Sequence, residues 1–134
     1  MTIVYAHFFP LPIVPTEVPA NVTVVESTAT TMSLSWAGIT CGVSSGGSLG
    51  VRYKYELRLT SDDTLIASDD ITSTSVTIDA LTAGTDYTFR VAASNDAGRS
   101  GYNEPPLAVM TVVDGVGRCI YISFIFLLCF YLCF

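Results

Sequence analysis

Four short segments of this sequence alternate between apolar and polar residues, and this pattern constrains the fold more than any other feature. The segments are MSLSW (32–36), YKYELRL (53–59), SVTI (75–78) and YTFRVAAS (87–94). A period of two places successive side chains on opposite faces of a β-strand. The pattern therefore predicts antiparallel sheets, in which each strand has one buried and one solvated face.

Turn residues separate the alternating segments about every ten residues, which is typical of a β-sandwich. Between Pro19 and Val113 no stretch shows a sustained helical period, and no internal repeat is present. We therefore predict one copy of an all-β, antiparallel sandwich of about 95 residues.

Composition divides the chain into three regions, which we predict to be a leader (1–15), a folded domain (16–114) and an apolar tail (115–134). The leader contains three prolines and no Lys or Arg. A signal peptide needs a basic start and an unbroken apolar core, so a linker or the remnant of an incomplete gene model is favoured. The tail has no charge after Arg118. As a helix, its last 16 or so residues would span about 24 Å of a bilayer core of about 30 Å, which makes it a partial transmembrane segment at most.

The segment LTAGTDYTFRVAASNDAGRSG (81–101) resembles the E–F corner, F strand and F–G loop of a fibronectin type III domain. Leu81, Thr85 and Tyr87 match the family pattern, while Ala83 stands where proline is usual. VPANVTVVESTATTMSLSW (18–36) resembles its A and B strands, and VRYKYELRL (51–59) resembles its C strand. The resemblance covers about 95 residues, close to the usual size of such a sandwich.

This resemblance implies an immunoglobulin-like sandwich of seven strands, arranged as the sheets A-B-E and C′-C-F-G. Tyr87 would form a tyrosine corner, in which the ring is buried and the hydroxyl bonds to the backbone a few residues upstream. The residues that would meet in the core are Trp36, Tyr55, Leu57, Ile78, Leu81, Tyr87, Phe89 and Val91. Glu56 and Arg90 would lie on the same solvent-facing side of one sheet, because strands C and F are neighbours.

Charge and chemistry exclude several classes of function. The chain has a formal net charge of −6 and only six Lys and Arg residues, which form no evident patch in the sequence, so nucleic acid is not an expected partner. The only histidine, His7, lies in the leader, so neither a catalytic site nor a cofactor is predicted. The aspartate pairs 62–63 and 69–70 flank TLIAS, where either a calcium site or ordinary polar turns would fit.

The four cysteines do not suggest a disulfide framework. Cys41 lies alone in the middle of the chain, and Cys119, Cys129 and Cys133 lie in the apolar tail. Cys41 is therefore either a free thiol or the partner of a group outside this chain.

Two surface positions are candidates for function. Asn21-Val22-Thr23 is an N-glycosylation sequon. By resemblance, residues 95–101 form the F–G loop with Arg99 at its exposed tip, and this loop is either a plain connection or a binding loop. The candidate binding residues are Asp96, Gly98, Arg99 and Ser100; the Arg-Gly-Asp triplet of some family members is not present.

By resemblance, we predict a non-catalytic protein-binding or adhesion module of a receptor-type protein, outside the cell or at its surface. Its partners would be other proteins, with membrane contact through the tail. Two rival interpretations remain. One is a passive structural spacer, and the other is a membrane-anchored stub of a truncated gene model.

Overall fold

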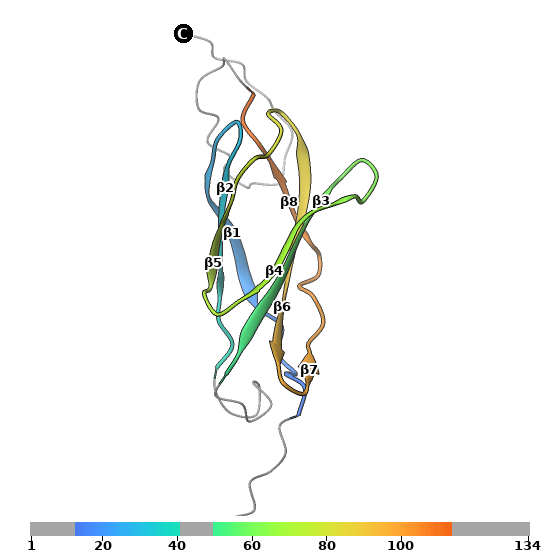
Figure 1. Ribbon diagram of the computed structural model, residues 1–134. Coiled ribbons are helices and arrows are strands. Elements are labelled where there is room, and N and C mark those ends of the chain that lie inside the picture. Colours follow the sequence, from blue (N-terminus) through green and yellow to red (C-terminus); the bar gives the residue numbers. More distant parts are fainter. Residues whose placement is uncertain (1–12, 41–49, 114–134) are drawn as a thin grey trace, which may run out of the picture.

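The structure is a computed structural model that describes residues 13–40 and 50–113 (Figure 1). His7, Cys41 with the rest of residues 41–49, and the apolar tail lie outside the described residues, so the predictions that concern them stay predictions. Among the described residues there is no helix long and apolar enough to cross a bilayer.

The described residues form two facing antiparallel sheets (Figure 1). The first sheet has the order β1–β2–β5, with β1 at Ala20–Ser27, β2 at Met32–Ala37 and β5 at Ser75–Ile78. The second has the order β4–β3–β6, with β4 at Leu65–Ile71, β3 at Arg52–Leu59 and β6 at Asp86–Asn95. Two further strands, β7 (Gly98–Arg99) and β8 (Leu107–Met110), pair with β6. The predicted all-β sandwich is confirmed.

The structure has eight strands where seven were predicted, because the last strand is divided. Both β7 and β8 pair with β6, so they continue one another along the same side of it. Pro105 and Pro106 lie between them. Proline has no backbone N–H to donate, which is incompatible with a continuous ladder at this point.

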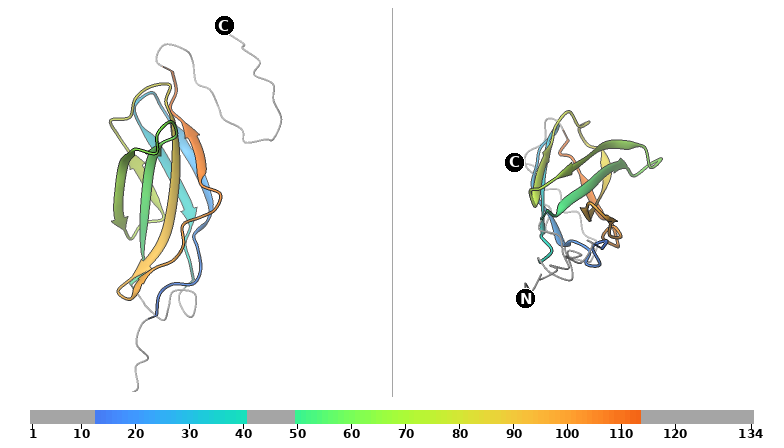
Figure 2. Two further views of the ribbon diagram at one scale, coloured as in Figure 1. Left: turned by 90° about the vertical axis from the view of Figure 1, so that its right-hand side faces the viewer. Right: turned by 60° about the horizontal axis from the view of Figure 1, so that its bottom comes forward.

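One long edge of the sandwich brings the two sheets together. Strands β1 and β8 belong to different sheets but lie side by side there (Figure 2). The hydroxyl of Ser27 donates a hydrogen bond to the carbonyl of Met110 at 2.9 Å. Further along, the amide of Val112 donates to the carbonyl of Thr28 at 3.0 Å. The chain up to Val112 is therefore part of the sandwich.

The core lies between the sheets, where the alternating apolar side chains meet. Trp36 packs against Phe89, with 5.9 Å between ring centroids, and against Tyr53, with 5.8 Å. Tyr55 also stacks on Phe89, with 5.9 Å between the ring centroids. All eight residues expected in the core are buried: Trp36, Tyr55, Leu57, Ile78, Leu81, Tyr87, Phe89 and Val91.

Tyr87 closes the corner that leads into β6. Its side chain is buried, and its hydroxyl oxygen accepts a hydrogen bond from the amide of Thr82 at 3.0 Å. Leu81 is buried beside this turn, and its amide donates to the carbonyl of Thr30 at 2.9 Å. The tyrosine hydroxyl thus bonds upstream, as expected, and its partner in the structure is an amide N–H.

We expect Tyr87→Phe to leave the domain folded but to lower its free energy of unfolding by about 1–2 kcal/mol. The ring remains in the core, while the partly buried amide of Thr82 loses its acceptor, and an unpaired buried polar group costs about this much. Urea denaturation of both proteins measures the difference. A variant as stable as the parent would show that the corner hydrogen bond contributes nothing.

Candidate functional site

Five of the six Lys and Arg residues of the sequence gather on the outer face of the five-stranded sheet. They are Arg52, Lys54, Arg58, Arg90 and Arg99. Arg52, Lys54 and Arg58 are an even number of residues apart in β3, so their side chains project from the same face of the sheet. Alternation along the strand and pairing between strands bring these cations, which are dispersed in the sequence, to one face, where four of them pair with carboxylates. We call this surface the charged face.

Glu56 lies at the centre of the charged face. It is opposite Arg90 in the β3–β6 register, and its Oε2 accepts hydrogen bonds from Nε and Nη2 of Arg90 at 3.0 and 2.7 Å. The same oxygen accepts from Nε of Arg58 at 3.0 Å. The expected placement of Glu56 and Arg90 on one outward side is confirmed. The pair is less exposed than a surface pair, because the Glu56 side chain is only 13% exposed.

Tyr102 is the remaining member of this network, and it lies between β7 and β8, outside the alternating segments of the sequence. Its hydroxyl donates to Oε1 of Glu56 at 2.5 Å and accepts from Nη1 of Arg99 at 2.6 Å. The guanidinium carbons of Arg90 and Arg99 lie 4.5 and 4.4 Å from the centroid of its ring. Such cation–π contacts hold both arginines in place.

The segment that carries Tyr102 is fixed to β6 on both sides of it. Ser100 is buried, and its hydroxyl accepts a hydrogen bond from the amide of Ala93 at 3.0 Å. Asn103 accepts one from the amide of Val91 at 2.7 Å through its side-chain oxygen. The position of Tyr102 over the sheet is therefore set by hydrogen bonds between its neighbours Ser100 and Asn103 and the backbone of β6, and does not depend on the cations alone.

The network changes the ionisation of its members. Burial by itself would raise the pKa of Glu56, but the hydrogen bonds from Tyr102, Arg90 and Arg58 outweigh this and lower that pKa to about 2. Burial and the hydrogen bond to Glu56 raise the pKa of the Tyr102 hydroxyl. Glu56 is therefore a carboxylate and Tyr102 a neutral hydroxyl at neutral pH.

The turn after β6 differs from the expected loop. The side-chain oxygen of Asn95 accepts hydrogen bonds from the amides of Ala97 and Gly98 at 2.9 and 3.1 Å, which closes a tight turn. Gly98 has φ of 148°, which favours glycine. Asp96 and Ala97 are the exposed tip.

Three of the four candidate loop residues therefore have other positions than expected. Gly98 lies in β7, opposite Asn95. Arg99 is not at the tip but in β7, paired with Ser94. Ser100 is buried. Asp96 remains accessible and makes an ion pair with Arg52 at 3.1 Å.

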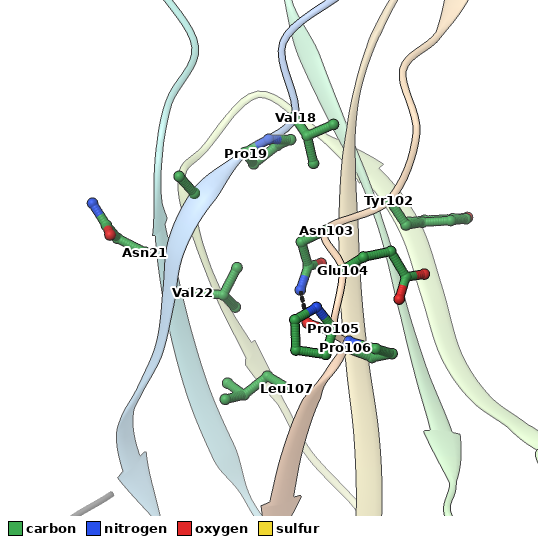
Figure 3. A pocket seen from close by; sticks show the side chains of 11 residues that line it. Val18, Pro19, Asn21, Val22, Tyr102, Asn103, Glu104, Pro105, Pro106 and Leu107 are labelled. Atoms are coloured by element: carbon green, nitrogen blue, oxygen red, sulfur yellow. Dashed lines mark hydrogen bonds between the residues drawn. The ribbon is translucent and has the colours of Figure 1, made fainter.

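A groove of about 620 Å³ lies at the β1–β8 edge of the sandwich (Figure 3). Its apolar lining comes from Val18, Pro19, Val22, Pro105, Pro106 and Leu107. Asn21 is exposed at its margin, in an irregular part of β1 where φ of this residue is 52°. Its side chain points away from the 102–107 segment (Figure 3).

The described residues offer no arrangement suited to holding a metal ion. No group of three or more His, Cys, Asp or Glu residues converges within residues 13–40 and 50–113. Asp69 and Asp70, expected in a polar turn, lie within β4, and Asp70 pairs with Lys54 at 3.4 Å.

A family model of the fibronectin type III domain matches residues 17–109. This chain belongs to the fibronectin type III domain family. Fibronectin type III domains are in general non-catalytic modules. The resemblance seen in the segment around Tyr87 is thereby confirmed.

Among curated proteins, the domain is similar to the receptor-type tyrosine-protein phosphatase F of Danio rerio, with 34% identity over 90 residues. The matched region is 65% of this chain and 4% of the length of that relative.

Solved structures share the fold. Domains A168–A170 from titin are 29% identical, with a TM-score of 0.63 over 74% of this chain and 32% of that one. The twitchin kinase region from C. elegans is 28% identical, with a TM-score of 0.64 over 81% of this chain and 18% of that one. A fibronectin type III domain of the human fibronectin type III domain containing protein 3 is 25% identical, with a TM-score of 0.61 over 75% and 89% of the two chains.

Proposed function

We propose that this domain is a non-catalytic, extracellular protein-binding module of a receptor-type or cell-surface protein. The family and the similarity to a receptor-type protein support this assignment. The observation that carries it is the charged face, where an aromatic ring and several arginines are held in fixed positions. Tyr and Arg are enriched in protein interfaces and dominate their binding energy.

Order within the charged face favours binding for a thermodynamic reason. Long side chains that are already immobilised lose less conformational entropy when a partner docks. Arg90 and Arg99 are each held against the Tyr102 ring. A partner that docks here meets a surface that needs little reorganisation.

A passive spacer is the second candidate function, and one contact favours it. The side-chain amide of Asn95 donates to the carbonyl of Ile13 at 2.6 Å. This bond ties the segment leading into the sandwich to the turn after β6. A rigid spacer requires that the segment entering the domain is held in a fixed orientation relative to it.

A screen against a panel of secreted and cell-surface ectodomains tests the binding function. The immobilised full chain, kept in a neutral detergent, should capture at least one ectodomain, and Tyr102→Ala should weaken that binding because it removes the ring that holds both arginines. The matched control is Val25→Ala, on the exposed part of β1 in the other sheet, where the side chain is 67% exposed. Loss of binding in the control alone would place the interface elsewhere, and no capture by a broad panel would favour the spacer.

We further propose that Asn21 carries an N-linked glycan. Its side chain is exposed and points away from the 102–107 segment (Figure 3), so that segment does not obstruct an oligosaccharide. Secretion from cultured animal cells, followed by treatment with a peptide N-glycosidase, should give a mobility shift that Asn21→Gln abolishes. An unchanged mobility of the secreted protein would contradict the proposal.

The division into a leader (1–15), a domain (16–114) and an apolar tail (115–134) leads to a prediction about solubility. Residues 16–114 should form a soluble, cooperatively folding monomer, because the edge contacts made by Val112 are retained. The full chain should aggregate or pellet with membranes, since an apolar segment of this length must be covered. Sedimentation and thermal unfolding of both proteins measure this.

A third protein, residues 13–114, is the control for that comparison. It restores the carbonyl of Ile13 that accepts from Asn95, and it should be slightly more stable than residues 16–114. If both short proteins are unfolded while the full chain is soluble without detergent, the tail belongs to the core of the domain.

A further inference from the structure

A shallow trough crosses the charged face at the end where β6 turns into β7. Its volume is about 780 Å³. It is lined by Arg52, Lys54, Asp70, Ser94, Asn95, Gly98 and Arg99. The register explains its shape, because Arg52 and Arg99 both pair with Ser94 from opposite sides. A short side chain on the central strand thus lies between two long cationic ones.

Charge in the trough opposes the charge of the whole chain. Three of its lining residues are cations and one is a carboxylate, whereas the chain has a net charge of −6. Arg99 is exposed, and its polar contact is with the Tyr102 hydroxyl. Among the described residues Arg99 makes no ion pair with a carboxylate.

The other two cations of the trough, Arg52 and Lys54, form ion pairs that are exposed to solvent. The Arg52 and Asp96 side chains are 47% and 83% exposed in their ion pair, and Lys54 and Asp70 are 29% and 46% exposed in theirs. Exposed pairs of this kind are worth at most about 1 kcal/mol. A carboxylate from another molecule can therefore replace Asp96 at little cost.

We propose that this trough binds carboxylate side chains in an acidic segment of a partner protein. The proposal rests on the protein-binding function and names the chemistry of the partner. Arginine guanidinium groups present paired donors that match the two oxygens of a carboxylate. Arg52 and Arg99 offer two such groups on opposite walls of one depression.

A short acidic segment fits better than a long polyanion. Asp70 in β4 lines one side of the trough, and Asp96 lies at the tip of the turn on another. A densely sulfated chain that extends past the cations would meet these carboxylates and the acidic remainder of the surface. One or two carboxylates can contact the cations without doing so.

Fluorescence anisotropy of a labelled Gly-Ser-Glu-Glu-Ser-Gly peptide tests the proposal with the full chain in a neutral detergent. We expect saturable binding that weakens with added salt. The double variant Arg52→Gln/Arg99→Gln should bind about tenfold more weakly, since two exposed charge contacts are lost. The control Val25→Glu/Thr30→Glu changes the net charge equally, on β1 and in the turn between β1 and β2, and should bind as the parent does.

Three outcomes would overturn the inference: no peptide binding by the parent chain, an equal loss in the control and the trough variant, or tighter binding of a heparin oligosaccharide than of the peptide at the same salt concentration. Circular dichroism checks that each variant is folded. If the ectodomain screen finds a partner whose binding does not depend on Arg52 and Arg99, the protein-binding function stands and only the trough inference fails.

Discussion

Trp36→Ala is expected to lower the free energy of unfolding by about 3–5 kcal/mol, enough to unfold a domain of ordinary stability. The Trp36 side chain is buried between the two sheets, against Tyr53 and Phe89. Its truncation leaves a cavity that neither ring can fill, because both are fixed in separate strands of the opposite sheet.

The design of this measurement follows from the composition. Trp36 is the only tryptophan, so unfolding must be followed by far-ultraviolet circular dichroism and not by tryptophan fluorescence. Trp36→Phe is the matched variant. The indole N–H is buried without a hydrogen-bond partner among the described residues, so its removal costs no bond seen there. We expect Trp36→Phe to be clearly more stable than Trp36→Ala, and equal stabilities would contradict the cavity argument.

The sequence predicted the core and the sheet arrangement because alternation is a local signal. Segments such as MSLSW and YKYELRL identify their inward residues without knowledge of the partner strand. Strand β1 shows the limit of this reasoning. It pairs with β2 through two register irregularities, and Val24 and Val25 are both exposed although they are adjacent.

The charged face could not be predicted in full, because it depends on register between distant strands. Tyr102 is 46 residues from Glu56 and lies outside every alternating segment. Only the β3–β6 pairing and the tight turn after β6 bring it there. Asn95 and Gly98 were the available signal for that turn, since Asn accepts from the amides that follow it and Gly takes the positive φ. A two-residue tip moves Arg99 from the loop into β7.

Thr111 is a second structural residue that no pattern marked. It is fully buried, and its hydroxyl donates to the carbonyl of Thr82 at 2.6 Å while accepting from the amide of Thr85 at 3.0 Å. A threonine near the end of a strand looks like any surface residue in the sequence. Thr111 has this role only because the segment after β8 packs against the E–F corner at Thr82 and Thr85.

Glu56→Gln is expected to destabilise the domain at neutral pH, by up to roughly 3 kcal/mol, and to do so less as the pH falls. The estimate follows from a pKa lowered from 4.5 to about 2, since each unit corresponds to about 1.4 kcal/mol. The Glu56 pKa is lower in the folded state, so its stabilising contribution is complete above about pH 4.5 and is lost as the pH falls toward about 2.

Urea denaturation of the parent and Glu56→Gln at several pH values between 7 and 2 measures this contribution. The difference between the two proteins isolates Glu56 from the other carboxylates, which titrate in both. Glu26→Gln is the control, because Glu26 is exposed on β1 and its replacement should change stability by less than about 0.5 kcal/mol. A parent–variant difference that stays constant from pH 7 to pH 2 would mean that the charge of Glu56, and its bonds to Arg58, Arg90 and Tyr102, do not stabilise the charged face.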